Sequence, residues 1–146
     1  MARRLTARRP RGFRLVVLPE GANVYGIRLE EANGADHDPE PVATVGADRL
    51  SRVTPSVMEA LQRSRIPRSQ LNPNRKSPIR IEEAAGVRLA LSLLAVEPVV
   101  KPARVEALLG GISAMSDEEA YYWYAKCMGK QAARARRALR LLLAEE

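Results

Sequence analysis

Two stretches near the N-terminus alternate apolar and polar residues. The alternating apolar positions are Phe13, Leu15 and Val17 in the first stretch and Tyr25, Ile27 and Leu29 in the second. A period of two residues is that of a half-buried β-strand, and a short apolar run over residues 42–45 predicts a third strand. Residues 13–50 are therefore predicted to form an antiparallel meander of about three strands, which needs helices to pack against.

From residue 54 onward, the apolar positions follow the helical period instead. Thr54 is a good N-cap residue and Pro55 suits the first helical position, so a helix is predicted over residues 54–65. Residues 68–78 form a polar, basic linker. Residues 81–96 are apolar almost all round, which predicts a central helix that is buried on most of its surface.

Further helices are predicted in the C-terminal half. A helix over residues 102–115 contains Gly110 and Gly111, which indicate a close approach to another backbone or a break in the helix. Ser116 and Glu119 have the spacing of a capping box, in which each side chain bonds the other residue's backbone N–H. The box predicts that the next helix starts directly after the serine.

The last predicted helix, over residues 131–144, is amphipathic. Its apolar stripe consists of Ala135, Ala138, Leu139 and Leu142. Its basic positions, with the residue just before it, are Lys130, Arg134, Arg136, Arg137 and Arg140. The stripe is expected to pack on the core, and the basic arc is expected to face water.

The net charge of +7 is distributed in blocks. Residues 1–19 carry six arginines and no acid, and residues 49–80 carry eight basic residues and one acid. Between them, residues 20–48 carry seven acids and one arginine. The basic segments are expected either to converge on one phosphate-binding face or to be solvated and paired with the acidic segments. Beyond the last helix, the candidate phosphate-binding residues are Arg68, Arg75 and Lys76 of the linker.

Most of the aromatic residues are consecutive. They are Tyr121, Tyr122, Trp123 and Tyr124. On a helix, neighbouring side chains point about 100° apart, so these four cannot form one stacking platform. One interpretation is a helix wedged into the core, with its phenol hydroxyls bonded to partners. The other is an exposed tyrosine or tryptophan that anchors an interface or stacks on a base.

No set of residues predicts a catalytic centre. Cys127 is the only cysteine and lies at a helix end, and the only histidine is His37 in an acidic loop. A nucleophile needs an adjacent base, and a zinc site needs further His or Cys ligands at suitable spacing. The protein is therefore predicted not to be an enzyme, and to hold no metal and no cofactor.

The apolar segments are short. The longest, over residues 89–96, cannot span a bilayer. No apolar segment of signal-peptide length follows the basic N-terminus, and a single cysteine allows no internal disulfide. We therefore expect a cytoplasmic protein without membrane contact, in which residues 1–12 are a disordered basic arm.

Three segments of the C-terminal two-thirds carry a resemblance. They are EEAAGVRLAL at residues 82–91, AMSDEEAYYWYAKC at residues 114–127, and RRALR at residues 136–140. Through them, the chain from residue 54 onward resembles a small uncharacterised prokaryotic domain family. The resemblance implies a shared fold, and it implies no catalytic residues.

Together these patterns predict a single α+β domain. A short antiparallel β-meander over residues 13–50 is expected to pack on about four or five helices over residues 54–146. The predicted function is that of a small non-enzymatic nucleic-acid-binding protein or accessory subunit, whose basic segments contact the phosphate backbone of DNA or RNA. The alternative is a protein–protein adaptor, or a small subunit of a larger assembly, whose charged surfaces match a partner protein.

Overall fold

Four strands form one antiparallel sheet. The structure is a computed structural model, and it describes residues 12–21, 24–32, 51–52, 54–74, 77–96, 99 and 101–144. The strands are β1 (Gly12–Gly21), β2 (Val24–Ala32), β3 (Ser51–Arg52) and β4 (Ile79–Glu82). Their order in the sheet is β3-β2-β1-β4, and every neighbouring pair is antiparallel.

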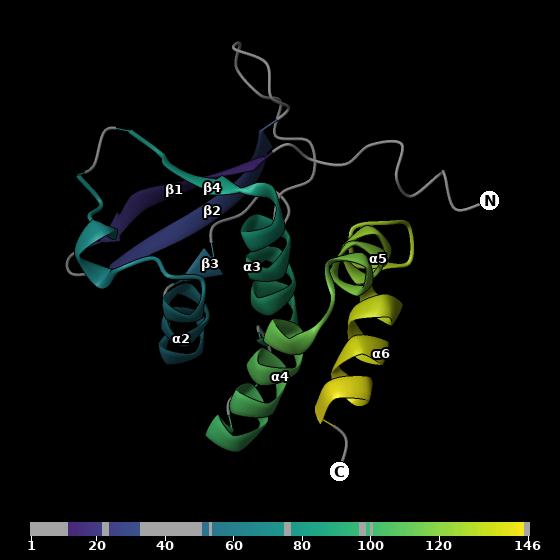
Figure 1. Cartoon of the computed structure of the whole chain (residues 1–146). Coiled ribbons are helices and arrows are strands. Elements are labelled where there is room, and N and C mark those ends of the chain that lie inside the picture. The colour runs from purple at the N-terminus through teal and green to yellow at the C-terminus, as the bar shows by residue number, and fades with distance from the viewer. Residues whose placement is uncertain are drawn as a thin grey trace.

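Five α-helices lie among the described residues, together with one short 3₁₀ helix. They are α2 (Pro55–Arg63), α3 (Glu83–Val96), α4 (Pro102–Ala114), α5 (Asp117–Cys127) and α6 (Ala132–Ala144), and the 3₁₀ helix η1 (Arg68–Gln70) follows α2. Figure 1 shows α2 and α3 below the sheet, α4 beneath α3, and the pair of α5 and α6 on the side away from α2. The predicted α+β class is therefore confirmed.

The hairpin of β1 and β2 has the predicted alternation of buried positions. Phe13, Leu15, Ile27 and Leu29 are each no more than 2% exposed. Leu15 lies opposite Leu29 in the register, so the two apolar sets share one face of the sheet. The third strand predicted over residues 42–45 lies outside the described residues.

β4 is a strand that the sequence patterns did not predict. A linker and then a helix from residue 81 are expected, but residues 79–82 pair with β1, so that Ile81 lies opposite Phe13. The burial of these positions alternates: Ile79 and Ile81 are buried, and Arg80 and Glu82 are exposed. This is the period of a strand, and the helix starts at Glu83 instead. The segment expected to be entirely helical therefore contributes one edge strand to the sheet.

α3 is the central helix of the fold, as predicted. It contacts β1, β4 and each of the other four helices, and most of its residues are buried. Gly86 makes this packing feasible, because a Cβ at that position would lie 2.0 Å from Cδ1 of Phe13. The Phe13 ring thus packs directly on the α3 backbone, which fixes the distance between the helix and the sheet.

The two adjacent glycines of α4 have different surroundings. The helix is continuous through Gly110 and Gly111, so the predicted alternative of a break is wrong. A Cβ at Gly111 would lie 2.8 Å from Cδ2 of Leu143 in α6, whereas a Cβ at Gly110 would meet nothing within 4 Å. Gly111 therefore marks the close approach of α4 to α6.

Candidate nucleic-acid interface

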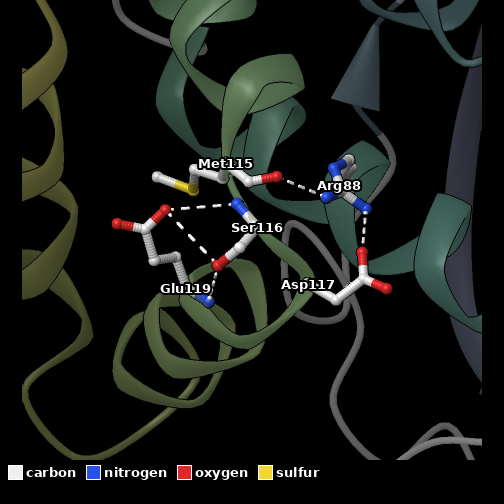
Figure 2. Close-up of polar contacts among 5 residues, drawn as sticks. All are labelled: Arg88, Met115, Ser116, Asp117 and Glu119. Carbon is white, nitrogen blue, oxygen red and sulfur yellow. Dashed lines mark hydrogen bonds and ion pairs between the residues drawn. The ribbon is translucent and has the colours of Figure 1, made fainter.

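The start of α5 is fixed by its capping box. Figure 2 shows the backbone N–H of Glu119 donating to Oγ of Ser116 at 3.1 Å, and the backbone N–H of Ser116 donating to Oε1 of Glu119 at 3.1 Å. The predicted box is therefore confirmed. It ends the turn after α4 and sets the direction in which α5 leaves it.

Arg88 of α3 ties the same corner to the central helix. Its Nη2 donates to the carbonyl oxygen of Met115 at 2.5 Å, and its Nη1 lies 2.9 Å from Oδ1 of Asp117 (Figure 2). The guanidinium is half-buried, and the carboxylate compensates its charge. The position of α5 is thus determined by two sets of polar contacts.

The inner side of α5 packs on α3 and reaches the sheet through Tyr124. Tyr124 is 6% exposed, and its hydroxyl donates to the carboxylate of Glu31 in β2. Its ring meets Phe13 edge to face, with 5.9 Å between the ring centroids. Tyr124 is therefore a core residue, as the wedged-helix interpretation expects, and it is not available as an interface anchor.

The outer side of α5 carries a different pair of aromatic rings. Tyr122 is 43% exposed and Trp123 is half-buried. The two rings meet edge to face, with 5.5 Å between their centroids. Nζ of Lys126 lies 5.5 Å from the centroid of the Tyr122 ring, a cation–π geometry. Tyr121 is partly buried against the core, so two of the four candidate aromatics reach the outer surface.

A groove lies between α5 and α6. Its volume is about 580 Å³, and its lining includes Tyr122 and Trp123. Three cations line the same groove: Lys126 at the end of α5, Lys130 in the turn, and Arg134 in the first turns of α6. The turn is tight, since a Cβ at Gly129 would lie 3.3 Å from the carbonyl oxygen of Ala125. Aromatic and basic side chains that are apart in the sequence thus meet on one surface.

Lys126 is a member of this groove that the sequence analysis did not single out. It follows Tyr122 by four residues, the spacing that places two side chains on the same face of a helix. That spacing is the signal that identifies it. The aromatic run and the basic arc were read as separate features, and Lys126 lies between them.

α6 is rotated relative to the predicted stripe. Leu139 is buried, and Ala135 and Leu143 are partly buried against the core, whereas Ala138 and Leu142 are exposed. The expectation that Ala138 and Leu142 pack inward is therefore wrong. The inward position belongs to Leu143, because it fills the space left by the missing side chain of Gly111 in α4.

This rotation divides the basic arc of α6 into two groups. Lys130, Arg134 and Arg137 are exposed, whereas Arg136 and Arg140 are half-buried. Burial lowers the pKa of Arg140, and so do the neighbouring positive charges of Arg136, of Arg104 in α4, and of Arg137. Positive charges of α4 and α6 thus lie near one another around Arg140.

Three arginines elsewhere in the described residues, Arg28, Arg63 and Arg88, have acidic partners. The ion pairs are Arg28 with Glu30 at 2.8 Å, Arg63 with Glu106 at 2.5 Å and Glu59 at 3.7 Å, and Arg88 with Asp117 at 2.9 Å. Across the same described ranges, no carboxylate pairs with Lys126, Lys130 or Arg134. Nη1 of Arg134 donates to the neutral Oε1 of Gln131 at 3.2 Å, a contact that does not balance its charge.

Arg68 of the basic linker does not join this surface. Arg68 is exposed in η1, directly after α2, and Figure 1 shows α2 and α6 on opposite sides of α3 and α4. Arg75 and Lys76 lie outside the described residues. The cations that the structure brings together are therefore those of α5, the turn and α6.

Cys127 faces the core, at the end of α5. It is 1% exposed, and burial raises the pKa of its thiol from 9.0 to about 11, although the charges of Arg136 and Arg140 act in the opposite direction. The thiolate is the nucleophile, so this cysteine is suited to packing. In the described part of the chain, no three His, Cys, Asp or Glu side chains are grouped to hold a metal, and no helix is long and apolar enough to cross a membrane. His37 lies outside the described residues.

Fold and groove together define a small α+β domain with an aromatic and basic surface on its C-terminal helical hairpin. The chain belongs to the family described as a domain of unknown function, DUF7680, whose model matches residues 3–145. The match extends well beyond the C-terminal region in which the sequence segments indicate a resemblance. No curated protein and no solved structure matches the chain.

Proposed function

We propose that this protein is a non-enzymatic nucleic-acid-binding protein, or the nucleic-acid-binding subunit of a larger assembly. The observation that supports this best is a set of cations at one groove, Lys126, Lys130 and Arg134, for which no described carboxylate is an ion-pair partner, with Arg137 next along α6. Each cation that neutralises a backbone phosphate releases condensed counterions, which favours binding. An array of exposed cations along a helix and a turn matches a chain of phosphates.

The ion pairs of Arg28, Arg63 and Arg88 support the same proposal, because they set these three arginines apart from the cations of the groove. A cation with a carboxylate partner adds little net field, whereas an uncompensated one attracts anions over roughly 8–10 Å at physiological salt. The net charge of +7 adds long-range attraction for polyanions. Backbone phosphates carry no sequence information, so binding of this type is expected to be largely independent of sequence.

A gel-shift or anisotropy titration with DNA and RNA, at low and at high salt, tests the proposal. The informative variant is Lys130→Ala with Arg134→Ala. The matched control, Arg68→Ala with Arg80→Ala, removes the same charge from η1 and β4, where both side chains are exposed. The first variant is expected to weaken binding strongly and to lower the dependence of log K on log salt by about one for each cation removed. The control is expected to bind almost as the wild type does.

Two outcomes would count against the proposal. Absence of binding to any nucleic acid even at low salt would remove it. Equal losses in the two double variants would show that net charge alone governs binding, and that the groove is not the site. The salt slope distinguishes these cases because it counts the phosphate contacts that are lost.

A second candidate function rests on a different observation. Leu141 and Leu142, in the last turn of α6, are 56% and 60% exposed, and they are consecutive. Exposed leucines of this kind favour contact with a partner protein, as an adaptor or small subunit would make. Sedimentation of the wild type and of Leu141→Ser with Leu142→Ser tests this. A change from an oligomer to a monomer would support it, and a monomeric wild type would oppose self-association.

A further inference from the structure

The groove between α5 and α6 contains aromatic rings as well as cations, and phosphate binding alone does not require them. We propose that this groove holds an unpaired base of a single-stranded nucleic acid, stacked on the exposed ring of Tyr122 beside Trp123, while the cations hold the adjoining phosphates. This inference rests on the proposed function and names its ligand as single-stranded rather than duplex.

The Tyr122 ring is both accessible and held in place. It is 43% exposed, and it is contacted by the edge-to-face partner Trp123 and by the ammonium of Lys126. Its orientation is therefore restricted before any ligand arrives, so little side-chain freedom is lost on binding. A ring with these properties is a stacking surface, and every base has a face that can use it.

The cations surround this ring on the side of α6. Lys130 and Arg134 line the same groove as Tyr122, and Gln131 orients the Arg134 guanidinium through a 3.2 Å hydrogen bond. A base in the groove would thus leave its own phosphate and the next one close to positive side chains. The volume of about 580 Å³ exceeds that of a single nucleobase.

Duplex nucleic acid cannot stack a base on the aromatic ring of this groove. In a duplex, both faces of each base are covered by its neighbours, and a base reaches a protein ring only if it is unpaired and swung out. A duplex would contact the cations and not the aromatic ring. Stacking on one ring is expected to raise affinity about tenfold, so a preference for single strands is the measurable consequence.

Trp123 is the only tryptophan of the chain, so its fluorescence reports on the groove directly. Four probes are titrated at equal length and salt: oligo(dT), oligo(U), an abasic oligonucleotide that has the backbone without bases, and a DNA duplex. Oligo(dT) and oligo(U) are expected to quench Trp123 and to bind about tenfold more tightly than the abasic strand. Equal affinities for oligo(dT) and oligo(U) would assign the site to unpaired bases in general. A clear difference between these two affinities would assign it to DNA or to RNA.

Three variants isolate the stacking contribution. Tyr122→Ala removes the ring and is expected to reduce oligo(dT) affinity to that of the abasic strand, while binding of the duplex is unchanged. Tyr122→Phe keeps the ring and is expected to keep the preference. Leu142→Ala is a matched control, because it shortens a similarly exposed side chain on α6 that does not line the groove.

The outcomes separate this inference from the proposed function. If oligo(dT) and the abasic strand bind equally and Tyr122→Ala changes neither, stacking is rejected while phosphate binding along α6 stands. Tighter binding of the duplex than of oligo(dT) would also reject it. If no probe binds at low salt, the proposed function and this inference fail together.

Discussion

The α3 side and the α6 side of this molecule place their arginines in opposite environments. Arg88 in α3 is half-buried. It forms an ion pair with Asp117 and donates a hydrogen bond to the carbonyl oxygen of Met115. Arg134 in α6 is exposed, and its described polar contact is a neutral glutamine oxygen. One arginine connects three elements of the fold, and the other connects none.

This difference separates groups that stabilise the fold from groups that do not. A charge removed from water needs a partner, because the desolvation of an unpaired ion is unfavourable, and Arg88 has that partner. Exposed cations beside one another, such as Lys130, Arg134 and Arg137, repel and add nothing to stability. Their removal should therefore weaken the proposed binding of nucleic acid, whereas removal of Arg88 should lower the free energy of unfolding.

The largest effect is expected where α3 meets the sheet. In Gly86→Ala the new Cβ would stand 2.0 Å from Cδ1 of Phe13, a ring that is 2% exposed and cannot move aside. Overpacking of this kind should lower the free energy of unfolding by about 3 kcal/mol. Urea denaturation followed by circular dichroism measures it.

Gly110→Ala is the matched control, since it makes the same change in a helix where a Cβ meets nothing within 4 Å. It should raise the free energy of unfolding by about 0.5–1 kcal/mol, because alanine is the better helix former. A similar loss in both variants would mean that the α3–sheet contact is looser than the structure has it.

A smaller effect is expected from the arginine pair itself. Arg88→Ala leaves the Met115 carbonyl without its charged donor and should lower the free energy of unfolding by about 1–2 kcal/mol. Arg134→Ala should change it by less than about 0.5 kcal/mol. Thermal and urea unfolding of the two variants compare them directly. Equal losses of unfolding free energy in the two variants would contradict the distinction between a paired arginine that stabilises the fold and an exposed arginine that does not.

Local signals explain why so much of the helical region was predictable. The starts of α2 and α5 depend on Thr54, Pro55 and the Ser116 box, and each of these acts within about one helical turn. β4 lacks such a signal. It is four residues long, it has two buried apolar positions, and its pairing partner β1 is far away in the sequence. Ile79 and Ile81 alternate with charged residues, which favours a strand, but four residues are too few to outweigh the helical pattern that follows, so the strand depends on its pairing with β1.

The candidate site was predictable only in part, for a related reason. Three consecutive leucines end α6, and their order does not say which one faces inward. Leu143 does so because Gly111 of α4 leaves room for it. The inward stripe is therefore shifted by less than the 100° between successive residues, since Ala135 and Leu139 face the core in both the predicted and the observed stripe. The groove with Lys126 then follows from the packing of α5 against α6, which no single segment contains.

The capping box offers a smaller test at the junction of the two regions. Ser116→Ala removes the oxygen that accepts from the Glu119 backbone at 3.1 Å, so the free energy of unfolding should fall by about 1 kcal/mol. Ser113→Ala, an exposed position inside α4, should leave it nearly unchanged. If the two variants unfold alike, the start of α5 is held by Arg88 and not by its cap.

The smallest effect at neutral pH is expected from Cys127, where the core meets the basic helix. Its folded-state pKa, about 11, lies above the ordinary value of 9.0, so the folded protein holds the thiol proton more tightly than the unfolded chain does. The corresponding stabilisation is fully present below pH 9 and is lost as the pH rises toward 11. Unfolding free energies from pH 8 to pH 11 should fall more steeply for the wild type than for Cys127→Ala.

The thiol should also react with a disulfide reagent at pH 8 only after unfolding, because it is 1% exposed and protonated. Parallel pH profiles in the two proteins, or rapid labelling of the folded wild type, would show that α6 leaves this thiol open to solvent and that the packing of α5 on α6 is looser than described.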